Sequence, residues 1–434
     1  MSVGLVGIIG IVVLLCALFF LGTPVGFGMG IIGFAGFCYI VSVPAGLKML
    51  GSVLWDIFSR YGLTVIPLVI LLGQIAFHSG VNENLYKAAY KWIGTIRGGI
   101  AMATITACSA FAAICGSNAA TAATMTTVAL PEMRKYNYDP RLSTGAVACG
   151  STLGVVIPPS VVLIVIGLST EQSIARLFYG SIVTGAILAV LMMLCAHLVC
   201  RRYPDWGPVG PHSGWLEKIT SLAGAAEVIV LFLLVMLGLF FGFFTPAEAG
   251  AAGSFFAVLI GVSRRRLSLK GFMAAVEETL RISCMVITIV AGAVIFGKFL
   301  AVTRIPFNIA SWVSDLPVSP TVIMLIIFVI YIIGGAVMDA LALLLITIPI
   351  FFPLAVELGY DPIWFSVTIT VITTMGAVTP PVGATTYVVG GMAKGVPLED
   401  VFRGVTFFLP AYLICVLLLM LFPAIVTFLP RLLG

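Results

Sequence analysis

Apolar segments of near-spanning length recur along this chain and constrain its fold more than any other feature. Segments 3–21, 222–244 and 408–429 are almost wholly apolar, and each is close to the roughly 20 residues with which a helix crosses a bilayer. Hydrophobic residues make up 61% of the sequence and charged residues 9%, whereas a soluble domain carries about 25% charged residues. The sequence therefore predicts an all-α integral membrane protein that lies in a lipid bilayer.

Several functional classes lack support in the sequence. The net charge of +5 is spread over the loops, which gives no indication of nucleic acid binding, and the nine cysteines form no CxxC pair. The three histidines are scattered, and the sequence contains no zinc-protease, serine-hydrolase or Walker motif. Segment 3–21 has no basic residues before it, so we interpret it as a membrane helix and not as a signal peptide. We expect neither an enzyme nor an ATP-driven pump.

The sequence repeats itself at a fixed offset. Short motifs recur in the same order 222 positions later: Thr23–Pro24 as Thr245–Pro246, Tyr138–Asp139–Pro140 as Tyr360–Asp361–Pro362, and Pro158–Pro159 as Pro380–Pro381. Several matches at one offset indicate an internal duplication. We predict a first repeat over 1–203, a cytoplasmic linker over 204–221 and a second repeat over 222–434.

The charges of equivalent loops indicate that the two repeats are inverted. Loop 134–141 carries Arg134, Lys135 and Arg141, whereas loop 356–363 has no Lys or Arg. Cytoplasmic loops are enriched in Lys and Arg, so the two loops should face opposite sides of the membrane. With a periplasmic N-terminus, most of the 22 Lys and Arg residues lie on the inner side. The exceptions are Lys48, Arg60, Arg176, Lys298, Arg304 and Arg431.

The predicted topology gives each repeat an odd number of crossings. The crossings are 3–21, 24–43, 63–80, 141–169, 180–200, 222–244, 246–262, 282–300, 363–390 and 405–428. Segments 98–131 and 320–353 are too long for one crossing and have Gly-rich or polar centres, so we predict re-entrant hairpins there. Mixed segments 84–97, 171–179, 268–281 and 394–403 are predicted as helices along the membrane surface.

Two segments combine small residues, hydroxyl groups and a proline pair inside an apolar stretch. They run from Gly150 to Pro159 and from Thr373 to Pro381, within the crossings 141–169 and 363–390. A proline removes a helical hydrogen bond and restrains the residue before it, so each pair should break its helix. Unwound backbone in lipid is costly unless it lines a cavity or binds a ligand, and paired breaks in two halves of a transporter indicate the transport site.

Carbonyl and hydroxyl oxygens at such breaks suit Na⁺, and half-helix N-termini suit an anion. We predict one Na⁺ site in each repeat, with the substrate between the hairpin tips. The first set is Ser117, Asn118, Gly150, Ser151, Thr152 and Gly154, and the second is Asp339, Thr373, Thr374, Gly376 and Thr379. The substrate and helix-break set is Asn118, Pro158, Pro159, Pro380 and Pro381.

Asp339 is the carboxylate that the sequence places deepest in an apolar stretch. An aspartate at the centre of a membrane helix costs about 2.5–3.5 kcal/mol on insertion scales, and we interpret it as functional. The alternative is a carboxylate that caps the second half of the hairpin, and a capping carboxylate can also bind the ion. For Thr121, Thr124 and Thr127, packing between helices is the favoured interpretation. Glu248, just after Thr245–Pro246, is interpreted as part of a helix start.

These motifs resemble the large membrane subunit of tripartite ATP-independent periplasmic (TRAP) transporters, and the resemblance covers essentially the whole chain. It depends on residues 115–125, 150–154 and 157–160 in the first half, and on Met338–Asp339, Pro349, Pro353 and 379–383 in the second. The resemblance implies a Na⁺-coupled, elevator-type importer of carboxylates such as C4-dicarboxylates or sialic acid. The first tip reads Gly-Ser-Asn where Gly-Ser-Ser is more usual, which leaves Asn118 open between ion and substrate.

The same resemblance implies a bacterial inner-membrane location and two partners. One is a periplasmic substrate-binding protein, and the other is a small membrane subunit of about four helices, expected as a separate chain because no such segment precedes Met1. One alternative is a stand-alone divalent-anion/Na⁺ symporter of related architecture, which needs no binding protein. A channel is a second alternative, but the predicted sites for a coupling ion favour alternating access instead. A membrane-embedded enzyme or electron-transfer subunit would need clustered His, Cys or carboxylates at membrane depth, and the sequence has none.

Overall fold

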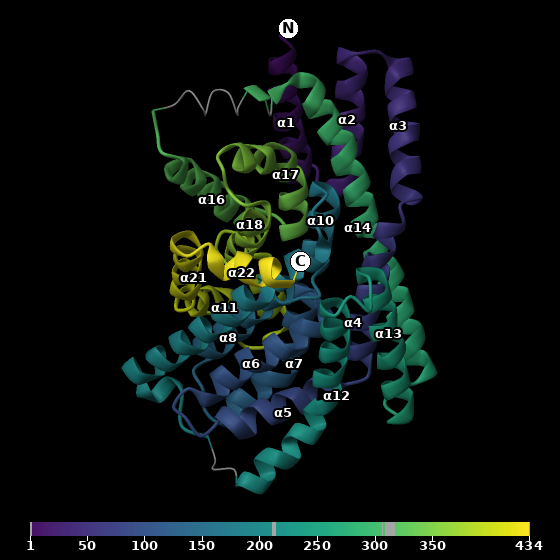
Figure 1. Cartoon of the computed structure of the whole chain (residues 1–434). Helices are drawn as coiled ribbons and strands as arrows, with labels where there is room; N and C mark the ends of the chain where they lie inside the picture. Colours follow the sequence, from purple (N-terminus) through teal and green to yellow (C-terminus); the bar gives the residue numbers. More distant parts are fainter. Residues whose placement is uncertain (1, 211–213, 306, 309–316, 434) are drawn as a thin grey trace.

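The computed structural model describes residues 2–210, 214–305, 307–308 and 317–433, and this part of the chain consists of helices and the turns that join them (Figure 1). The first half contains α1 (Val3–Phe20), α2 (Val25–Ile40), α3 (Val43–Phe58), η1 (Tyr61–Thr64), α4 (Val65–His78), α5 (Val81–Ile93), α6 (Gly99–Cys115), α7 (Asn118–Lys135), α8 (Pro140–Ser151), α9 (Leu153–Val156), α10 (Val161–Thr170), α11 (Ile174–Arg202) and η2 (Pro204–Trp206). The second half contains α12 (Trp215–Phe240), α13 (Pro246–Ser263), α14 (Leu269–Thr303), α16 (Pro320–Val337), α17 (Ala340–Glu357), α18 (Pro362–Gly376), α19 (Ala384–Met392), α20 (Leu398–Thr406), α21 (Leu409–Leu421) and α22 (Ala424–Leu433).

Both predicted hairpins are present, and they lie at opposite ends of the molecule. Helices α6 and α7 are separated only by Gly116–Ser117, and α16 and α17 only by Met338–Asp339. Figure 1 places α16 and α17 toward the upper end and α6 and α7 toward the lower end. This arrangement confirms the fold class predicted from the sequence, an all-α membrane protein of two inverted repeats.

Each proline pair breaks its helix as predicted. In the first repeat α8 and α9 end before Pro158–Pro159 and α10 follows, and in the second repeat α18 ends before Pro380–Pro381 and α19 follows. Both Pro–Pro bonds are cis. Because proline supplies no N–H and clashes with the preceding turn, neither pair can be accommodated within a continuous helix.

The repeated Tyr-Asp-Pro motif starts the two broken helices. The Asp139 carboxylate accepts a hydrogen bond from the Arg141 N–H at 2.8 Å, and the Asp361 carboxylate accepts one from the Ile363 N–H at 2.9 Å. Each aspartate is thus an N-cap, and the proline after it occupies the first helical position. Asp139 and Asp361 are therefore explained by helix capping.

Thr245 and Glu248 form a capping box at the start of α13. The Glu248 N–H donates to Thr245 Oγ1 at 3.3 Å, and Glu248 Oε2 accepts from the Thr245 N–H at 2.8 Å. Two backbone donors at the helix start are satisfied in this way. The interpretation of Glu248 as a residue of a helix start is confirmed.

Within the described residues, ten helices are long and apolar enough to cross a bilayer. The crossing predicted near 405–428 extends too far, because α21 ends at Leu421 and Pro423 precedes α22. The candidate span is Leu398–Leu421. Segments 171–179 and 268–281 are not separate surface helices, because they lead directly into α11 and α14. No proline interrupts residues 174–202 or 269–303, so each helix continues without a break from the predicted surface segment into the predicted crossing.

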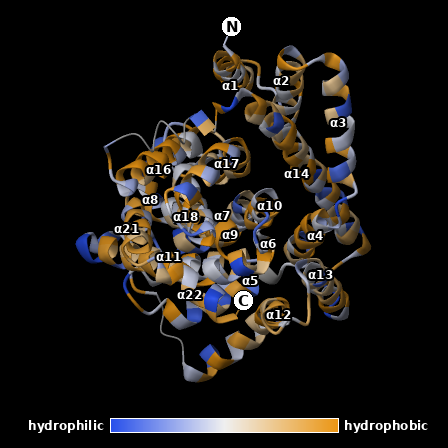
Figure 2. Cartoon of the chain, turned by 45° about the horizontal axis from the view of Figure 1, so that its top comes forward, coloured by the Kyte–Doolittle hydropathy of each residue, from blue (hydrophilic) through white to orange (hydrophobic). Residues whose placement is uncertain are grey.

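The helices form two groups that lie side by side. Helices α1–α4 and α12–α14, called the outer layer here, lie beside a body made of α6–α11 and α16–α22 (Figures 1 and 2). In the outer layer α14 packs along α2 so closely that a Cβ added to Gly292 would collide with the Gly26 carbonyl. The α2–α14 pair therefore forms a tight seam next to the body.

The segment that follows α11 is bound to the base of the first hairpin. The Asp139 N–H donates to the Trp206 carbonyl at 3.0 Å, and the Tyr138 hydroxyl donates to the Pro208 carbonyl at 2.9 Å. The Arg141 guanidinium lies 4.4 Å from the Trp206 ring centroid, a cation–π contact. Helix α12 begins at Trp215, within the 204–221 range predicted as linker.

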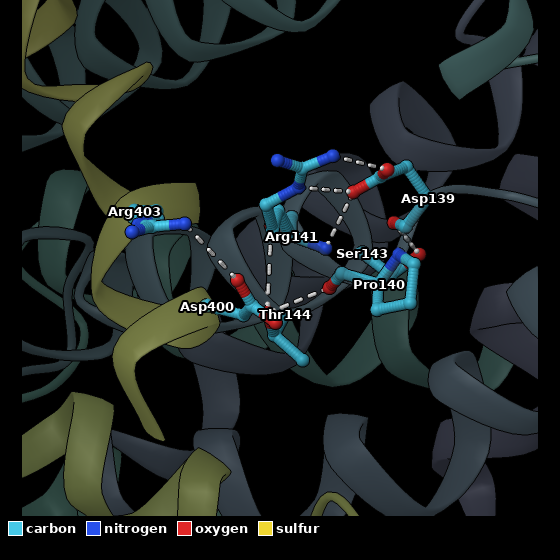
Figure 3. Close-up of polar contacts among 7 residues, drawn as sticks. All are labelled: Asp139, Pro140, Arg141, Ser143, Thr144, Asp400 and Arg403. Carbon is cyan, nitrogen blue, oxygen red and sulfur yellow. Dashed lines mark hydrogen bonds and ion pairs between the residues drawn. The ribbon is translucent and has the colours of Figure 1, made fainter. Parts of the chain in front are cut away.

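Charged side chains from both repeats meet at the same end of the body (Figure 3). Arg141 forms an ion pair with Asp139 at 3.0 Å, and Arg403 of α20 lies 3.9 Å from Asp400. Burial alone would raise the pKa of Asp139, but hydrogen bonds from Arg141 and its positive charge outweigh burial and hold that pKa below its ordinary value. Each of these ion pairs is local to its own helix, and α8 and α20 are held together by close backbone packing, in which a Cβ added to Gly404 would collide with the Arg141 carbonyl oxygen.

Candidate functional site

The first hairpin tip rests on the first helix break. A Cβ added to Gly116 would lie 2.8 Å from the Pro159 carbonyl oxygen, and one added to Gly154 would lie 2.8 Å from the Ser117 carbonyl oxygen. Both Pro158 and Pro159 are buried. Of the six residues predicted for the first Na⁺ site, Ser117 and Gly154 are thus brought into direct contact.

Helix α7 presents polar atoms directly after this tip. The Asn118 Oδ1 and Thr124 Oγ1 atoms are buried without a hydrogen-bond partner among the described residues. The Thr121 hydroxyl donates to the Ser117 carbonyl at 2.8 Å and lies 3.1 Å from a Cβ position on Gly154. Thr121 therefore joins the candidate set. Its spacing of four residues from Ser117, on the same helix face, was the available sequence signal.

The remaining residues of the first set stabilise the break from other sides. Gly150 faces α6, where an added Cβ would lie 3.1 Å from Cys108 Sγ. The Ser151 hydroxyl donates to the Val147 carbonyl at 2.6 Å. The Thr152 hydroxyl lies 2.7 Å from the Cys149 carbonyl and 2.6 Å from the Tyr412 hydroxyl. The contacts described for these three residues are thus with α6, α8 and α21, and not with the hairpin tip.

Tyr412 is a residue that sequence reasoning missed. It lies on α21 in the second repeat, is fully buried, and bonds to Thr152 and the Cys149 carbonyl in the first repeat. The Cys149 carbonyl also accepts from the Thr152 N–H, a shortened turn at the end of α8. The unwound segment is therefore stabilised from the other repeat by a contact without a local sequence signal.

The second hairpin contacts its break one turn before the tip. The Val382 and Gly383 N–H groups donate to the Ala336 carbonyl at 3.0 and 3.1 Å. A Cβ added to Gly335 would lie 2.8 Å from the Thr373 carbonyl oxygen, and one added to Gly376 would lie 2.7 Å from Gly335 Cα. The predicted residues Thr373 and Gly376 therefore contact the Gly-rich end of α16.

Asp339 lies at the tip of the second hairpin and is the N-cap of α17. Its carboxylate accepts a hydrogen bond from the Leu341 N–H at 2.9 Å, and the residue is exposed. Ser117 is the N-cap of α7 at the equivalent position of the first repeat. Asp339 can thus cap the helix with one oxygen and leave the other for a cation, so the capping and ion-binding interpretations are compatible.

The threonines of the second break donate to carbonyls of their own helix. Thr373 donates to Ile369 at 2.6 Å, Thr374 to Val371 at 2.7 Å and Thr379 to Met375 at 2.6 Å. A hydroxyl that donates its proton still carries lone pairs. Pro380 and Pro381 are exposed, unlike the first proline pair.

The second half of each broken helix packs on the opposite repeat. Helix α10 contacts α17 and α18, and α19 contacts α7 and α8. Each break is therefore enclosed by elements of both repeats, with the N-terminus of α7 beside the first break and the end of α16 beside the second. Such a site offers hydroxyl and carbonyl oxygens to a cation and half-helix N-termini to an anion.

Known proteins resemble this chain in sequence and in fold. The family described as tripartite ATP-independent periplasmic transporter, DctM component, matches residues 12–425. The chain is 32% identical over 392 residues to the C4-dicarboxylate TRAP transporter large permease protein DctM of Pseudomonas aeruginosa, covering 90% of this chain and 91% of that protein. It is 28% identical over 416 residues to the sialic acid TRAP transporter large permease protein SiaM of Vibrio cholerae, covering 96% of each. Its fold is similar to that of the Alcanivorax borkumensis YdaH transporter, with a TM-score of 0.65 and 16% identity over 88% of this chain and 89% of that one.

Proposed function

The chain belongs to the DctM component family of tripartite ATP-independent periplasmic transporters, and from this premise we propose that it imports a small organic anion into a bacterial cell with Na⁺ as the coupling ion. The relatives named for C4-dicarboxylates and sialic acid favour a carboxylate. A periplasmic binding protein delivers the anion, and a small four-helix subunit completes the transporter. The protein spans the inner membrane with its N-terminus in the periplasm.

The observation that carries the ion-coupling proposal is the contact of each hairpin with a broken helix. Gly154 lies against the Ser117 carbonyl, and Gly376 lies against Gly335. Because these contacts are so close, an ion bound at the break would act on the hairpin backbone directly, without an intervening side chain. Hydroxyls that already donate to carbonyls, such as those of Thr121 and Thr373, keep lone pairs for Na⁺.

The arrangement of the two layers supports an elevator motion. Both hairpins and both breaks belong to the body, whereas the close α2–α14 seam belongs to the outer layer. We propose that the body slides as one unit along the outer layer and carries substrate and Na⁺ together. The contacts between α8 and α20 hold the two repeats together during this motion.

The primary test is uptake by the complete transporter. The chain is reconstituted in proteoliposomes with its small subunit and binding protein, and uptake of radiolabelled succinate and N-acetylneuraminate is measured with and without a Na⁺ gradient. We expect Na⁺-dependent uptake of one of these acids that requires the binding protein. Uptake indifferent to Na⁺ would remove the coupling proposal, and equal uptake without the binding protein would favour the stand-alone symporter.

Asp339→Asn separates the charge of this residue from its capping role. Asparagine caps a helix about as well as aspartate, so we expect the variant to fold and to require at least about tenfold more Na⁺ for half-maximal uptake, a loss of about 1.4 kcal/mol of ion binding. Asp361→Asn, at the N-cap of α18, is the matched control and should keep the wild-type Na⁺ dependence. A wild-type Na⁺ response in Asp339→Asn would assign Asp339 to capping alone.

A further inference from the structure

We propose that Lys298 and Arg304 form a receiving site for the anionic substrate, in a cavity between the outer layer and the second hairpin. The cavity has a volume of about 520 Å³ and is lined by α14, α17 and the end of α10. Small-molecule sites typically have about 300–1,000 Å³, so a dicarboxylate or a sugar acid fits. This inference rests on the proposed function and names the path by which its substrate enters.

The two cations lie on one face of α14. Lys298, Ala301 and Arg304 follow one another at three-residue spacing, and all three line the cavity. Arg304 is the C-cap of α14, where a positive charge is favourable in any protein. Lys298 lies more than a turn earlier, so the helix end does not explain it.

No described carboxylate neutralises these two charges. The ion pairs of the described residues involve other arginines and lysines. Lys298 and Arg304 are both exposed, and the facing wall of α17 is apolar, with Ile348, Pro349 and Phe352. Charge of one sign between low-dielectric walls focuses the electric field and raises the local concentration of the opposite ion.

The second cavity lies on the corresponding turns of the other hairpin. It has a volume of about 810 Å³ and touches α7 at Thr127 and Pro131, which correspond to Pro349 and Pro353 on α17 in the first cavity. The elements that line the two cavities lie toward opposite ends of the molecule, with α17 above and α5 and α7 below in Figure 1. In this proposal, the two cavities are the entrance and the exit of one path.

The upper cavity is the more positive of the two, which favours import of an anion. The lower cavity contains Lys87 and Lys91, but Glu132 also lines it, and Lys91 pairs with Glu217 at 3.7 Å. The upper cavity has two cations and no acidic residue among its described lining. An anion is thus attracted at the periplasmic side and held less strongly at the cytoplasmic side.

The test is the double variant Lys298→Gln/Arg304→Gln in the complete transporter, in vesicles of phosphatidylcholine alone. The probe is whichever of succinate and N-acetylneuraminate the wild type takes up. We expect the half-saturating concentration to rise about three- to tenfold, with the maximal rate within about twofold, because steering acts on encounter and not on translocation. Inhibition of the wild-type rate by choline chloride should be weaker in the variant.

The matched control is Lys48→Gln/Arg60→Gln, which removes two exposed cations of the same predicted side that do not line the cavity. An unchanged half-saturating concentration in the test variant, or an equal rise in the control, would overturn the proposal. An effect that appears only when phosphatidylglycerol is added would assign the cations to a lipid phosphate and would also overturn it. Failure of the proposed function is distinguishable, because the wild type itself would then show no Na⁺-driven uptake.

Discussion

Gly154→Ala tests whether the first hairpin must touch the break for the ion to bind. The new Cβ would lie 2.8 Å from the Ser117 carbonyl oxygen, 2.9 Å from its carbonyl carbon and 3.1 Å from Thr121 Oγ1. Two of these neighbours are backbone atoms at the hairpin tip, which cannot swing aside as a flexible side chain can. To regain an ordinary contact of 3.4 Å, the tip must retreat by about 0.6 Å, a small-to-large change of the kind that costs overpacked cores energy.

The expected cost follows from this overlap. Overpacking a well-packed site costs about 1–3 kcal/mol, which is about a 5- to 150-fold change in an equilibrium constant. Replacing glycine by alanine in a helix returns up to about 1 kcal/mol through helix propensity, so the fold should survive. We therefore expect the Na⁺ concentration for half-maximal uptake to rise by about tenfold, with the protein still present in the membrane.

The assay is Na⁺-dependent uptake in proteoliposomes, paired with thermal unfolding in detergent at increasing Na⁺. The control is Gly391→Ala on α19, where an added Cβ meets nothing within 4 Å. Gly391→Ala should leave the Na⁺ dependence unchanged. A Gly154→Ala protein with wild-type Na⁺ dependence, or a Gly391→Ala protein impaired to the same degree, would refute the idea that tip contact controls ion binding.

Three further predictions concern the supports of the site. Tyr412→Phe should lower thermal stability, because the hydrogen bond of a buried hydroxyl contributes about 0.5–1.5 kcal/mol, and it should raise the Na⁺ concentration for half-maximal uptake. The control Tyr179→Phe loses a hydrogen bond to the Leu239 carbonyl and should affect stability alone. Thr245→Ala should cost about 0.5–2 kcal/mol by removing the α13 N-cap, seen as a lower unfolding temperature, with no change in Na⁺ dependence. The contacts that lower the pKa of Asp139 stabilise the fold at pH values above its unfolded pKa of about 3.9. This stabilisation disappears as the pH falls through the lower pKa of the folded state. The unfolding temperatures of the wild type and of Asp139→Asn should therefore converge on acidification below about pH 4.

The breaks and hairpins could be predicted because their causes are local. Proline pairs, glycines and capping aspartates such as Asp139 and Asp361 act within a turn or two of their own position. The end of the final crossing was predicted too late, because the apolar sequence continues past Pro423 although helix α21 ends at Leu421. Tyr412 could not be predicted, since it reaches Thr152 across 260 positions of sequence, and only the fold brings them together.

The sequence also could not predict which neighbours the small residues of a break contact. Gly150 and Gly154 are glycines of the same short segment, yet Gly150 faces Cys108 of α6 and Gly154 faces the hairpin tip. Thr152 separates α8 from α9 between these two glycines, and the Ser151 and Thr152 hydroxyls donate to the Val147 and Cys149 carbonyls there. The sequence can therefore indicate a candidate segment, but the contacts of each residue within it depend on the fold.

The packing of the two repeats on each other makes both candidate sites at the helix breaks polar with little charge. Each break is enclosed by a hairpin of its own repeat and by a half-helix of the other, α19 beside α7 and α10 beside α17. Hydroxyls at the breaks, such as those of Thr121 and Thr373, satisfy carbonyls of their own helices and remain acceptors. A site of this kind is stable when empty, because no buried charge awaits a partner, and it can still surround a cation with oxygen. The exposed Asp339 adds a negative charge at one tip only, so we expect the two proposed ion sites to differ in affinity, with the proposed Asp339 site the stronger.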